Sequence, residues 1–228
     1  MDRNTYLLLE DYMKRCMDVG GHDAEHIYRV LYSALQIAEQ TPNVDSDILI
    51  TACLLHDIGR SEQRKDPKVC HAQIGGEKAY AFLLENGFEK DFSQRVKDCI
   101  QTHRFRKNRQ PESIEAKILF DADKLDATGA IGIARTLIYE ADTKEPLYVL
   151  RSDGSICNGV DTEEKSFFRE YKFKLEKLYD RFYTEKGRQM ALSRKKAAAD
   201  FYHALYGEIS DGYAEGKTIL DTLTAGKE

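Results

Sequence analysis

Apolar residues recur at helical spacing along most of this chain. Within residues 24–40, Ile27, Val30, Leu31 and Ala34 share one helix face, because they are spaced i, i+3, i+4 and i+7. Prolines, which cost about 3 kcal/mol inside a helix, rarely interrupt the pattern, since the chain has only 4 of them. The spacing predicts helices over residues 5–17, 24–40, 46–57, 72–86, 90–103, 111–127, 129–141, 162–186 and 188–210.

Residues 142–160 depart from the helical pattern. An Asp153-Gly154 pair between two short β-prone runs is typical of a small hairpin, but the same stretch also suits a disordered loop. The sequence contains no internal repeat, low-complexity tract or linker that would divide it. We therefore predict an all-α fold in a single domain over residues 1–228, with a short hairpin or a loop at about 142–160.

The composition is that of an ordinary globular protein. Hydrophobic residues make up 42% of the chain and charged residues 32%, so a packed core is expected and disorder is not. The net charge of −5 provides no general attraction to nucleic acid or to anionic membranes, and neither is expected as a partner.

Three features predict a cytoplasmic location. The longest nearly apolar run, DILITACLL, is too short to span a bilayer. The N-terminal residues lack the basic-then-apolar order of a signal peptide. The 5 cysteines are irregularly spaced and include no CxxC pair, as expected of reduced and mostly buried thiols.

Histidines and aspartates gather at three places in predicted helices. His56 and Asp57 end an apolar helix, and His26 lies on the apolar side of an earlier one. Residues 121–127, DADKLDA, place three aspartates in a segment otherwise rich in apolar residues. Buried carboxylates are costly unless they are paired, hydrogen-bonded or bound to metal, so three of them within seven residues need an explanation.

Four ordered motifs make the chain resemble the HD-domain superfamily of metal-dependent phosphohydrolases. They are HDAEHIYRV at 22–30, LLHDIGR at 54–60, HAQIGG at 71–76 and DADKLDATGAIGIAR at 121–135. The resemblance is to a bacterial branch and covers about residues 20–140. It implies an HD-type helical bundle, with the motif core at about 20–140 and the C-terminal helices within 162–210.

The resemblance also implies a set of metal ligands: His26, His56, Asp57 and Asp123. Asp123 is the aspartate directly before the lysine of the last motif, the position that the family uses. Two imidazoles and two carboxylates suit one divalent ion, for which we favour Mn²⁺ over Mg²⁺, Co²⁺, Ni²⁺ or Fe²⁺. A ligand set without cysteine argues against a structural zinc site.

Phosphoryl transfer at such a metal needs fixed cations that stabilise the developing charge. Lys124 directly follows a ligand, and relatives contact the substrate phosphate from this position; Arg60 lies three residues after another ligand. We expect both to bind substrate and assist catalysis. The remaining candidates for substrate binding are His22 and a positive rim that begins with Arg104 and extends through Arg106, Lys107 and Arg109.

Two further pairs have expected roles near the metal. Asp121 and Asp126 are expected to orient ligand histidines by accepting hydrogen bonds from their free ring N–H groups. His71 and His103 either ligate a second metal bridged by Asp57 or act as catalytic groups beside a single metal, donating to phosphate oxygens or to the leaving group. We favour the single-metal interpretation.

The resulting hypothesis is metal-dependent hydrolysis of a phosphoric ester or anhydride, with a nucleotide as the preferred substrate and release of pyrophosphate as the preferred specific reaction. The alternatives are a binuclear cyclic-nucleotide phosphodiesterase, a di-iron oxygenase and a non-enzymatic nucleotide sensor. Because long connections often act as lids, residues 142–160 are predicted to lie near the site and to become ordered when nucleotide binds. A surface excursion far from the metal would explain this segment equally well.

Overall fold

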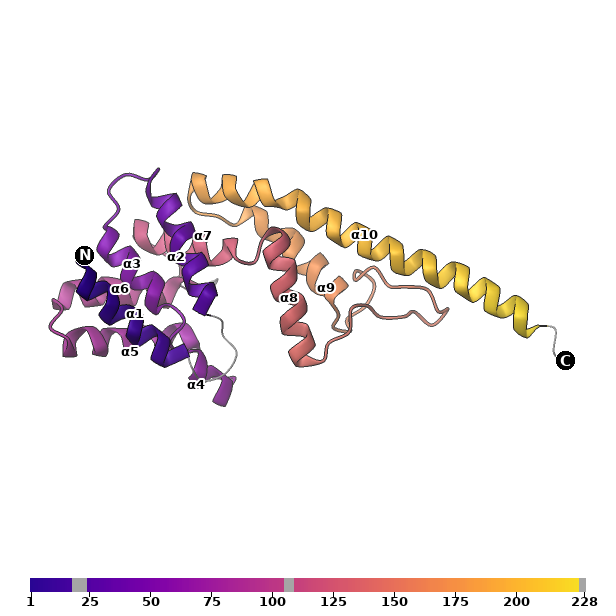
Figure 1. The fold of residues 1–228 in the computed structure, drawn as a ribbon, viewed down its shortest axis with the longest axis horizontal. Helices are drawn as coiled ribbons and strands as arrows, with labels where there is room; N and C mark the ends of the chain where they lie inside the picture. The colour runs from indigo at the N-terminus through magenta and orange to yellow at the C-terminus, as the bar shows by residue number, and fades with distance from the viewer. Residues whose placement is uncertain (18–23, 105–108, 226–228) are drawn as a thin grey trace. The chain divides into compact units, whose positions relative to one another are not determined.

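The computed structural model describes residues 1–17, 24–104 and 109–225, and these residues are predominantly helical. The predicted all-α fold is confirmed: within the described ranges no sheet strand occurs. The helices are α1 (Arg3–Met17), α2 (Ala24–Ala38), α3 (Ser46–Leu55), α4 (Arg60–Lys65), α5 (His71–Glu85), α6 (Lys90–Thr102), α7 (Ile114–Leu125), α8 (Gly129–Thr143), α9 (Phe167–Phe173), the 3₁₀ helix η1 (Leu175–Asp180) and α10 (Glu185–Thr224) (Figure 1).

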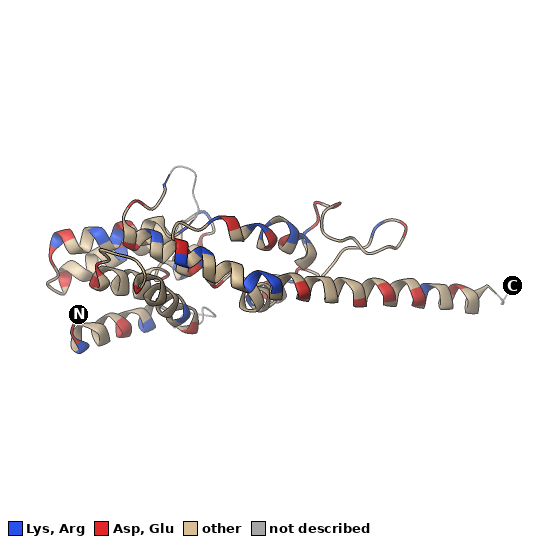
Figure 2. Ribbon diagram, turned by 90° about the horizontal axis from the view of Figure 1, so that it is seen from above, with Lys and Arg blue, Asp and Glu red and all other residues tan. Residues whose placement is uncertain are grey.

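Contacts divide the chain into two compact units. Unit 1 comprises Met1–Asp126 and Phe182–Gln189, and unit 2 comprises Ala127–Arg181 and Met190–Glu228. Charged residues of both signs are spread along the helices of each unit (Figure 2). None of the helices in the described part of the chain combines the length and apolar character needed to cross a membrane. The single domain expected over 1–228 stays a prediction.

Helix α3 forms the centre of unit 1. Its sequence, SDILITACLL, is apolar on every side, and residues such as Leu49, Ala52 and Leu54 are fully buried. Asp45 caps the helix by accepting hydrogen bonds from the backbone amides of Asp47 and Ile48. Helices α1, α2, α6 and α7 pack around it, and α5 packs against α6. The C-terminal end of α3, and with it the His-Asp pair that follows, is therefore enclosed by protein.

Unit 2 has its own apolar core. Aromatic residues from α9 and α10, among them Phe167, Phe168, Tyr171 and Tyr202, form a buried cluster with Leu175 of η1. Tyr171 and Tyr202 stack with ring centroids 4.3 Å apart. The aromatic residues within the predicted helix over residues 162–186 thus face a core.

The structure corrects the predicted helix over 162–186, which is broken into α9 and η1. Lys174 has φ −125° and ψ −63°, outside the helical range. After η1, the backbone amides of Tyr183 and Thr184 donate to the Asp121 carboxylate and are therefore not available for helical hydrogen bonds. Helix α10 then runs to Thr224, beyond the predicted end at residue 210.

The segment 142–160 is a loop with a tight turn and not a regular hairpin. Leu150 and Ile156 form an isolated antiparallel bridge. The amide of Gly154, with φ 80°, donates to the carbonyl of Arg151 over 2.9 Å and closes the turn. The hairpin that the sequence allowed is thus reduced to a single bridge. The role of residues 142–160 as a lid stays a prediction.

Candidate metal centre

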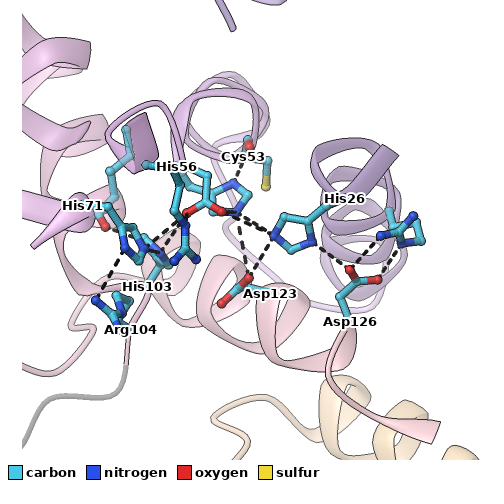
Figure 3. Close-up of polar contacts among 12 residues, drawn as sticks. His26, Cys53, His56, His71, His103, Arg104, Asp123 and Asp126 are labelled. Carbon is cyan, nitrogen blue, oxygen red and sulfur yellow. Dashed lines mark hydrogen bonds and ion pairs between the residues drawn. The ribbon is translucent and has the colours of Figure 1, made fainter. Parts of the chain in front are cut away.

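The four predicted ligands converge in unit 1. Figure 3 labels His26, His56 and Asp123 among them. His26 Nε2 lies 3.4 Å from His56 Nε2 and 3.4 Å from Asp123 Oδ1. Asp57 Oδ2 lies 3.7 Å from His26 Nε2 and 3.8 Å from His56 Nε2. These atoms come from α2, the end of α3 and α7, three helices that pack against one another. The first group therefore presents two imidazole nitrogens and two carboxylate oxygens to one point.

A second group shares Asp57 with the first. Asp57 Oδ1 lies 3.3 Å from His71 Nε2 and 3.7 Å from His103 Nε2. The two imidazole Nε2 atoms are 3.2 Å apart. The histidines come from the first residue of α5 and the residue after α6, and all three side chains are buried. Because Asp57 directs one oxygen to each group, the arrangement offers two adjacent positions for cations.

Each of the four histidines has its Nδ1 atom next to an acceptor. His26 Nδ1 lies 2.7 Å from Asp126 Oδ2, and His71 Nδ1 lies 2.6 Å from Gln63 Oε1. The Nδ1 atoms of His56 and His103 lie 2.8 and 2.6 Å from the carbonyl oxygens three residues earlier. Such contacts place the proton on Nδ1, so that in the neutral ring the Nε2 lone pair faces Asp57.

Asp57 itself lacks hydrogen-bond donors among the described residues. Both of its carboxylate oxygens are buried without a hydrogen bond. Arg60 Nε lies 2.9 Å from Asp57 Oδ1 but forms an ion pair without hydrogen-bond alignment. Burial favours the neutral acid, yet His56 and Arg60 hold the pKa of Asp57 well below its usual range. A buried anion surrounded by imidazole lone pairs is stabilised by a divalent cation, so the donor set fits a metal.

The histidines differ in charge. Burial lowers the pKa of His71 to about 2 and that of His103 to about 4, so both rings are neutral. Burial also opposes the charged form of His26, but hydrogen bonds to Asp123 and Asp126 outweigh it and raise the pKa of His26 to about 9. An ion that binds the first group therefore displaces a proton from His26 Nε2.

Asp126 lies where a residue that orients a ligand should lie. Besides contacting His26, it accepts hydrogen bonds from Arg29 Nε over 2.7 Å and Arg29 NH2 over 3.1 Å. Arg29 thus fixes the position of the Asp126 carboxylate, which in turn orients the His26 ring. The motifs alone indicate no role for Arg29, although it stands three residues after His26 in the first motif, on the same side of α2.

Asp121 has partners other than those expected. Its carboxylate accepts hydrogen bonds from the amides of Tyr183 and Thr184 and from the hydroxyl of Thr184, over 2.6–2.8 Å. It therefore fixes the segment before α10 in place of a ligand histidine. The reason is its position in α7: Asp121 lies two residues before Asp123, about 200° around the helix from it.

The predicted phosphate-binding cations occupy different surroundings. Arg60 lies beside Asp57, and Arg104 NH1 lies 3.5 Å from His71 Nδ1. Lys124 Nζ lies 4.5 Å from the centroid of the Phe120 ring. Arg109 donates to Gln73 and Gln101 on α5 and α6. Contact of any of these with phosphate stays a prediction, and His22, Arg106 and Lys107 lie outside the described residues.

Gln63 is a site residue that the sequence analysis missed. It belongs to α4, a helix of 6 residues that apolar periodicity did not predict, since none of its residues is buried. A polar side chain in such a short exposed helix gives no pattern from which a contact with His71 can be inferred. Its sequence position, three residues after Arg60, is the only available signal.

Comparisons with known proteins identify the family of the chain. The sequence profile of the HD domain matches residues 23–128. A protein of Bacillus subtilis strain 168, the uncharacterized protein YpgQ, is 31% identical over 194 residues, which are 83% of this chain and 85% of YpgQ. The chain therefore belongs to the HD-domain superfamily, whose members include proteins described as predicted hydrolases.

Solved structures show the same fold. The crystal structure of B. subtilis YpgQ matches with a TM-score of 0.69 at 28% identity, covering 90% of this chain and 96% of YpgQ. YpgQ in complex with ADP matches with a TM-score of 0.67 at 28% identity, covering 88% and 97%. A predicted HD superfamily hydrolase from an uncultured Thermotogales bacterium matches with a TM-score of 0.59 at 29% identity, covering 88% and 90%.

Proposed function

We propose that this protein hydrolyses a phosphoric anhydride of a nucleotide in a metal-dependent reaction, with release of pyrophosphate from a nucleoside triphosphate as the preferred activity. The observation that carries the proposal is Asp57, a buried carboxylate without hydrogen-bond donors among the described residues, facing imidazole nitrogens on both sides. Such a site is costly to keep unless it holds a cation that takes part in the function.

The nucleotide part of the proposal has separate support. YpgQ, at 28% identity over 88% of this chain, was crystallised with ADP. ADP contains the anhydride bond and the charged phosphates that a metal and nearby arginines recognise. Arg60 and Arg104 lie on the side of Asp57 occupied by His71, where they can pair with phosphate oxygens.

The residues of the first group would hold the catalytic ion, for which Mn²⁺ remains our preference. Bound there, a divalent ion lowers the pKa of a water ligand and polarises a phosphoryl oxygen. Asp126 and Arg29 keep His26 oriented toward that position. Asp123 has a side chain 26% exposed, so the first group is accessible from solvent. Arg60 and Lys124 are the cations proposed to stabilise charge on the phosphoryl group.

A second candidate function is hydrolysis of a phosphodiester, such as a cyclic nucleotide, by a two-ion centre. The observation that favours it is the second group, in which neutral His71 and His103 direct Nε2 atoms at Asp57 Oδ1. Nδ1-protonated rings cannot donate from Nε2 to phosphate, which weakens the expected role of these histidines as donors beside one metal.

The test is a Mn²⁺-supplemented screen of nucleoside mono-, di- and triphosphates and cyclic nucleotides, with pyrophosphate and orthophosphate measured separately. Release of pyrophosphate, abolished by chelation and restored by Mn²⁺, is expected. Asp57→Ala should lose metal and activity while keeping its helical circular dichroism signal, whereas Asp98→Ala, at an exposed aspartate of α6, should keep both.

Wild-type turnover by Asp57→Ala in metal-supplemented buffer would contradict the proposed site. Cleavage of cyclic nucleotides alone, with two ions bound, would favour the second candidate. An iron colour that bleaches on reduction would indicate the oxygenase, and nucleotide binding without hydrolysis the sensor. The five cysteines, all without disulfide partners, support the cytoplasmic location that we propose.

A further inference from the structure

Nδ1 of His71 has two neighbours that require opposite protonation states. Gln63 Oε1, 2.6 Å away, accepts a hydrogen bond and therefore needs a proton on Nδ1. Arg104 NH1, 3.5 Å away, can only donate and therefore needs a bare Nδ1. A neutral imidazole carries one proton, so it satisfies one neighbour at a time. The neighbour that forms the stronger hydrogen bond with Nδ1 therefore determines whether Nε2 faces Asp57 with a lone pair or with an N–H group.

The position of this proton determines what His71 can do in the second group, which it forms with Asp57 and His103. With the proton on Nδ1, His71 Nε2 is a lone pair, 3.3 Å from Asp57 Oδ1 and 3.2 Å from His103 Nε2, and can ligate a metal ion. With the proton on Nε2, the same atom donates to Asp57 or to a substrate oxygen and cannot ligate. The choice of tautomer is thus a choice between a metal ligand and a hydrogen-bond donor.

Several contacts hold Gln63 close to His71. Lys78 of α5 donates to the carbonyl of Ile58 and to Glu62, each over 2.8 Å, and so ties the start of α4 to α5. Gly59 permits this approach, because a Cβ atom there would lie 2.3 Å from the carbonyl oxygen of His71. Gln63 therefore approaches Nδ1 from a fixed element and at a shorter distance than Arg104.

We propose that Gln63 is a positioning residue that, in opposition to Arg104, keeps His71 in the tautomer that binds a second divalent ion together with Asp57 and His103. The inference rests on the proposed metal-dependent function but concerns only the second ion. The ion that this second site would bind is a divalent cation with affinity for imidazole and carboxylate, and Mn²⁺ serves as the probe. The first ion is held by His26, His56, Asp57 and Asp123, a set that does not include His71, the contact of Gln63.

The chain offers a matched set of variants. Gln63→Leu removes the acceptor and leaves Arg104 as the neighbour of Nδ1. Gln63→Glu keeps an acceptor and cannot donate. The double variant Gln63→Leu/Arg104→Ala removes both opposing groups. Gln94→Leu makes the same change at an exposed glutamine of α6 and is the control. Circular dichroism and retention of the first ion establish that each variant is folded.

Two measurements test the proposal without relying on turnover. Nitrogen-15 NMR of metal-free, histidine-labelled protein should show His71 protonated on Nδ1 in wild type and shifted toward Nε2 protonation in Gln63→Leu. Calorimetric titration with Mn²⁺ should find two ions in wild type, in Gln63→Glu and in Gln94→Leu. In Gln63→Leu the second ion should bind about 10–100-fold more weakly, as is usual when a group behind a ligand is removed. The double variant should recover part of this loss.

The outcomes separate this inference from the proposed function. Nε2 protonation of His71 in wild type, or equal second-ion affinity in wild type and Gln63→Leu, would overturn the role of Gln63. So would loss of the second ion in Gln63→Glu, or no recovery in the double variant. A wild type that binds one ion and hydrolyses nucleotide also overturns the inference but leaves the proposed function intact. A wild type without metal and without hydrolysis overturns both.

Discussion

Replacing Glu140 by glutamine should stabilise the protein, and the gain should depend on pH. Glu140 lies in α8 of unit 2 and is 3% exposed. Neither carboxylate oxygen has a hydrogen-bond partner among the described residues. Burial, together with the negative charges of Glu170 and Glu145, raises the pKa of Glu140 from 4.5 to about 7, although Lys174 opposes the shift. The folded protein therefore prefers this carboxyl group in its neutral form.

The direction and size of the effect follow from this pKa. Because the folded pKa lies above the unfolded value of 4.5, the stability associated with protonated Glu140 is fully present below pH 4.5. It is lost as the pH rises toward 7 and stays lost above it. At about 1.4 kcal/mol per pKa unit, the total loss is about 3 kcal/mol. Glutamine cannot ionise, so the variant should avoid most of that loss.

The assay is urea unfolding of wild type and Glu140→Gln at a series of pH values from 4.5 to 8, followed by circular dichroism. The difference in free energy of unfolding should be small at pH 4.5, grow as the pH rises to 7 and then level off at about 2–3 kcal/mol. Glu164→Gln, at an exposed glutamate of unit 2, should show no such trend. A difference that does not change with pH, or a variant less stable than wild type at pH 8, would refute the reasoning.

Four further outcomes are expected. Asp126→Asn should weaken binding of the first ion about 10–100-fold in calorimetry, because His26 loses its anchor. Gly59→Ala should lower the free energy of unfolding by about 1–3 kcal/mol, since its Cβ would meet a backbone oxygen at 2.3 Å. The control Gly207→Ala, in open space on α10, should raise the free energy of unfolding by up to about 1 kcal/mol. Lys124→Ala should lower kcat/KM about 100-fold at unchanged metal content, and an unchanged kcat/KM would remove it from catalysis. Hydrogen exchange with a non-hydrolysable nucleotide should show added protection over residues 142–160, and no added protection would exclude a lid.

Apolar periodicity predicted the helices of unit 1 well where each buries a broad face. It placed α2, α5 and α6 to within about two residues at either end. It failed where periodicity and backbone conformation diverge. Residues 167–178 keep an apolar stripe across the break at Lys174, because both α9 and η1 direct that stripe at the same core. Spacing alone cannot detect such a break, since residues spaced i, i+3, such as Leu175 and Leu178, lie on one face of both a 3₁₀ helix and an α-helix.

The motifs predicted the side chains that the structure brings together around Asp57, whereas most of the groups behind their rings were not predicted. Two of the four Nδ1 partners are backbone carbonyls, at Cys53 and Ile100, and any residue there would supply the same oxygen. The side chains at those positions therefore carry no trace of the contact. Asp126 was accessible to prediction because its charge is unusual beside an apolar helix. Sequence thus reveals side chains whose residue type is needed for a contact, such as Asp126. It does not reveal contacts made by backbone atoms, which every residue has.

The same distinction explains why the sequence left the number of metal ions open. His71 and His103 are imidazoles whichever role they have, so residue type cannot separate a ligand from a donor. The structure adds the Nδ1 contacts, which decide where the proton lies. It also shows Asp57 with an oxygen toward each group. If the second ion binds as we propose, its affinity depends on the acceptors behind His71 and His103. The acceptor behind His103 is a backbone carbonyl, whereas Gln63 is a side chain that a point mutation can remove without touching the ligands.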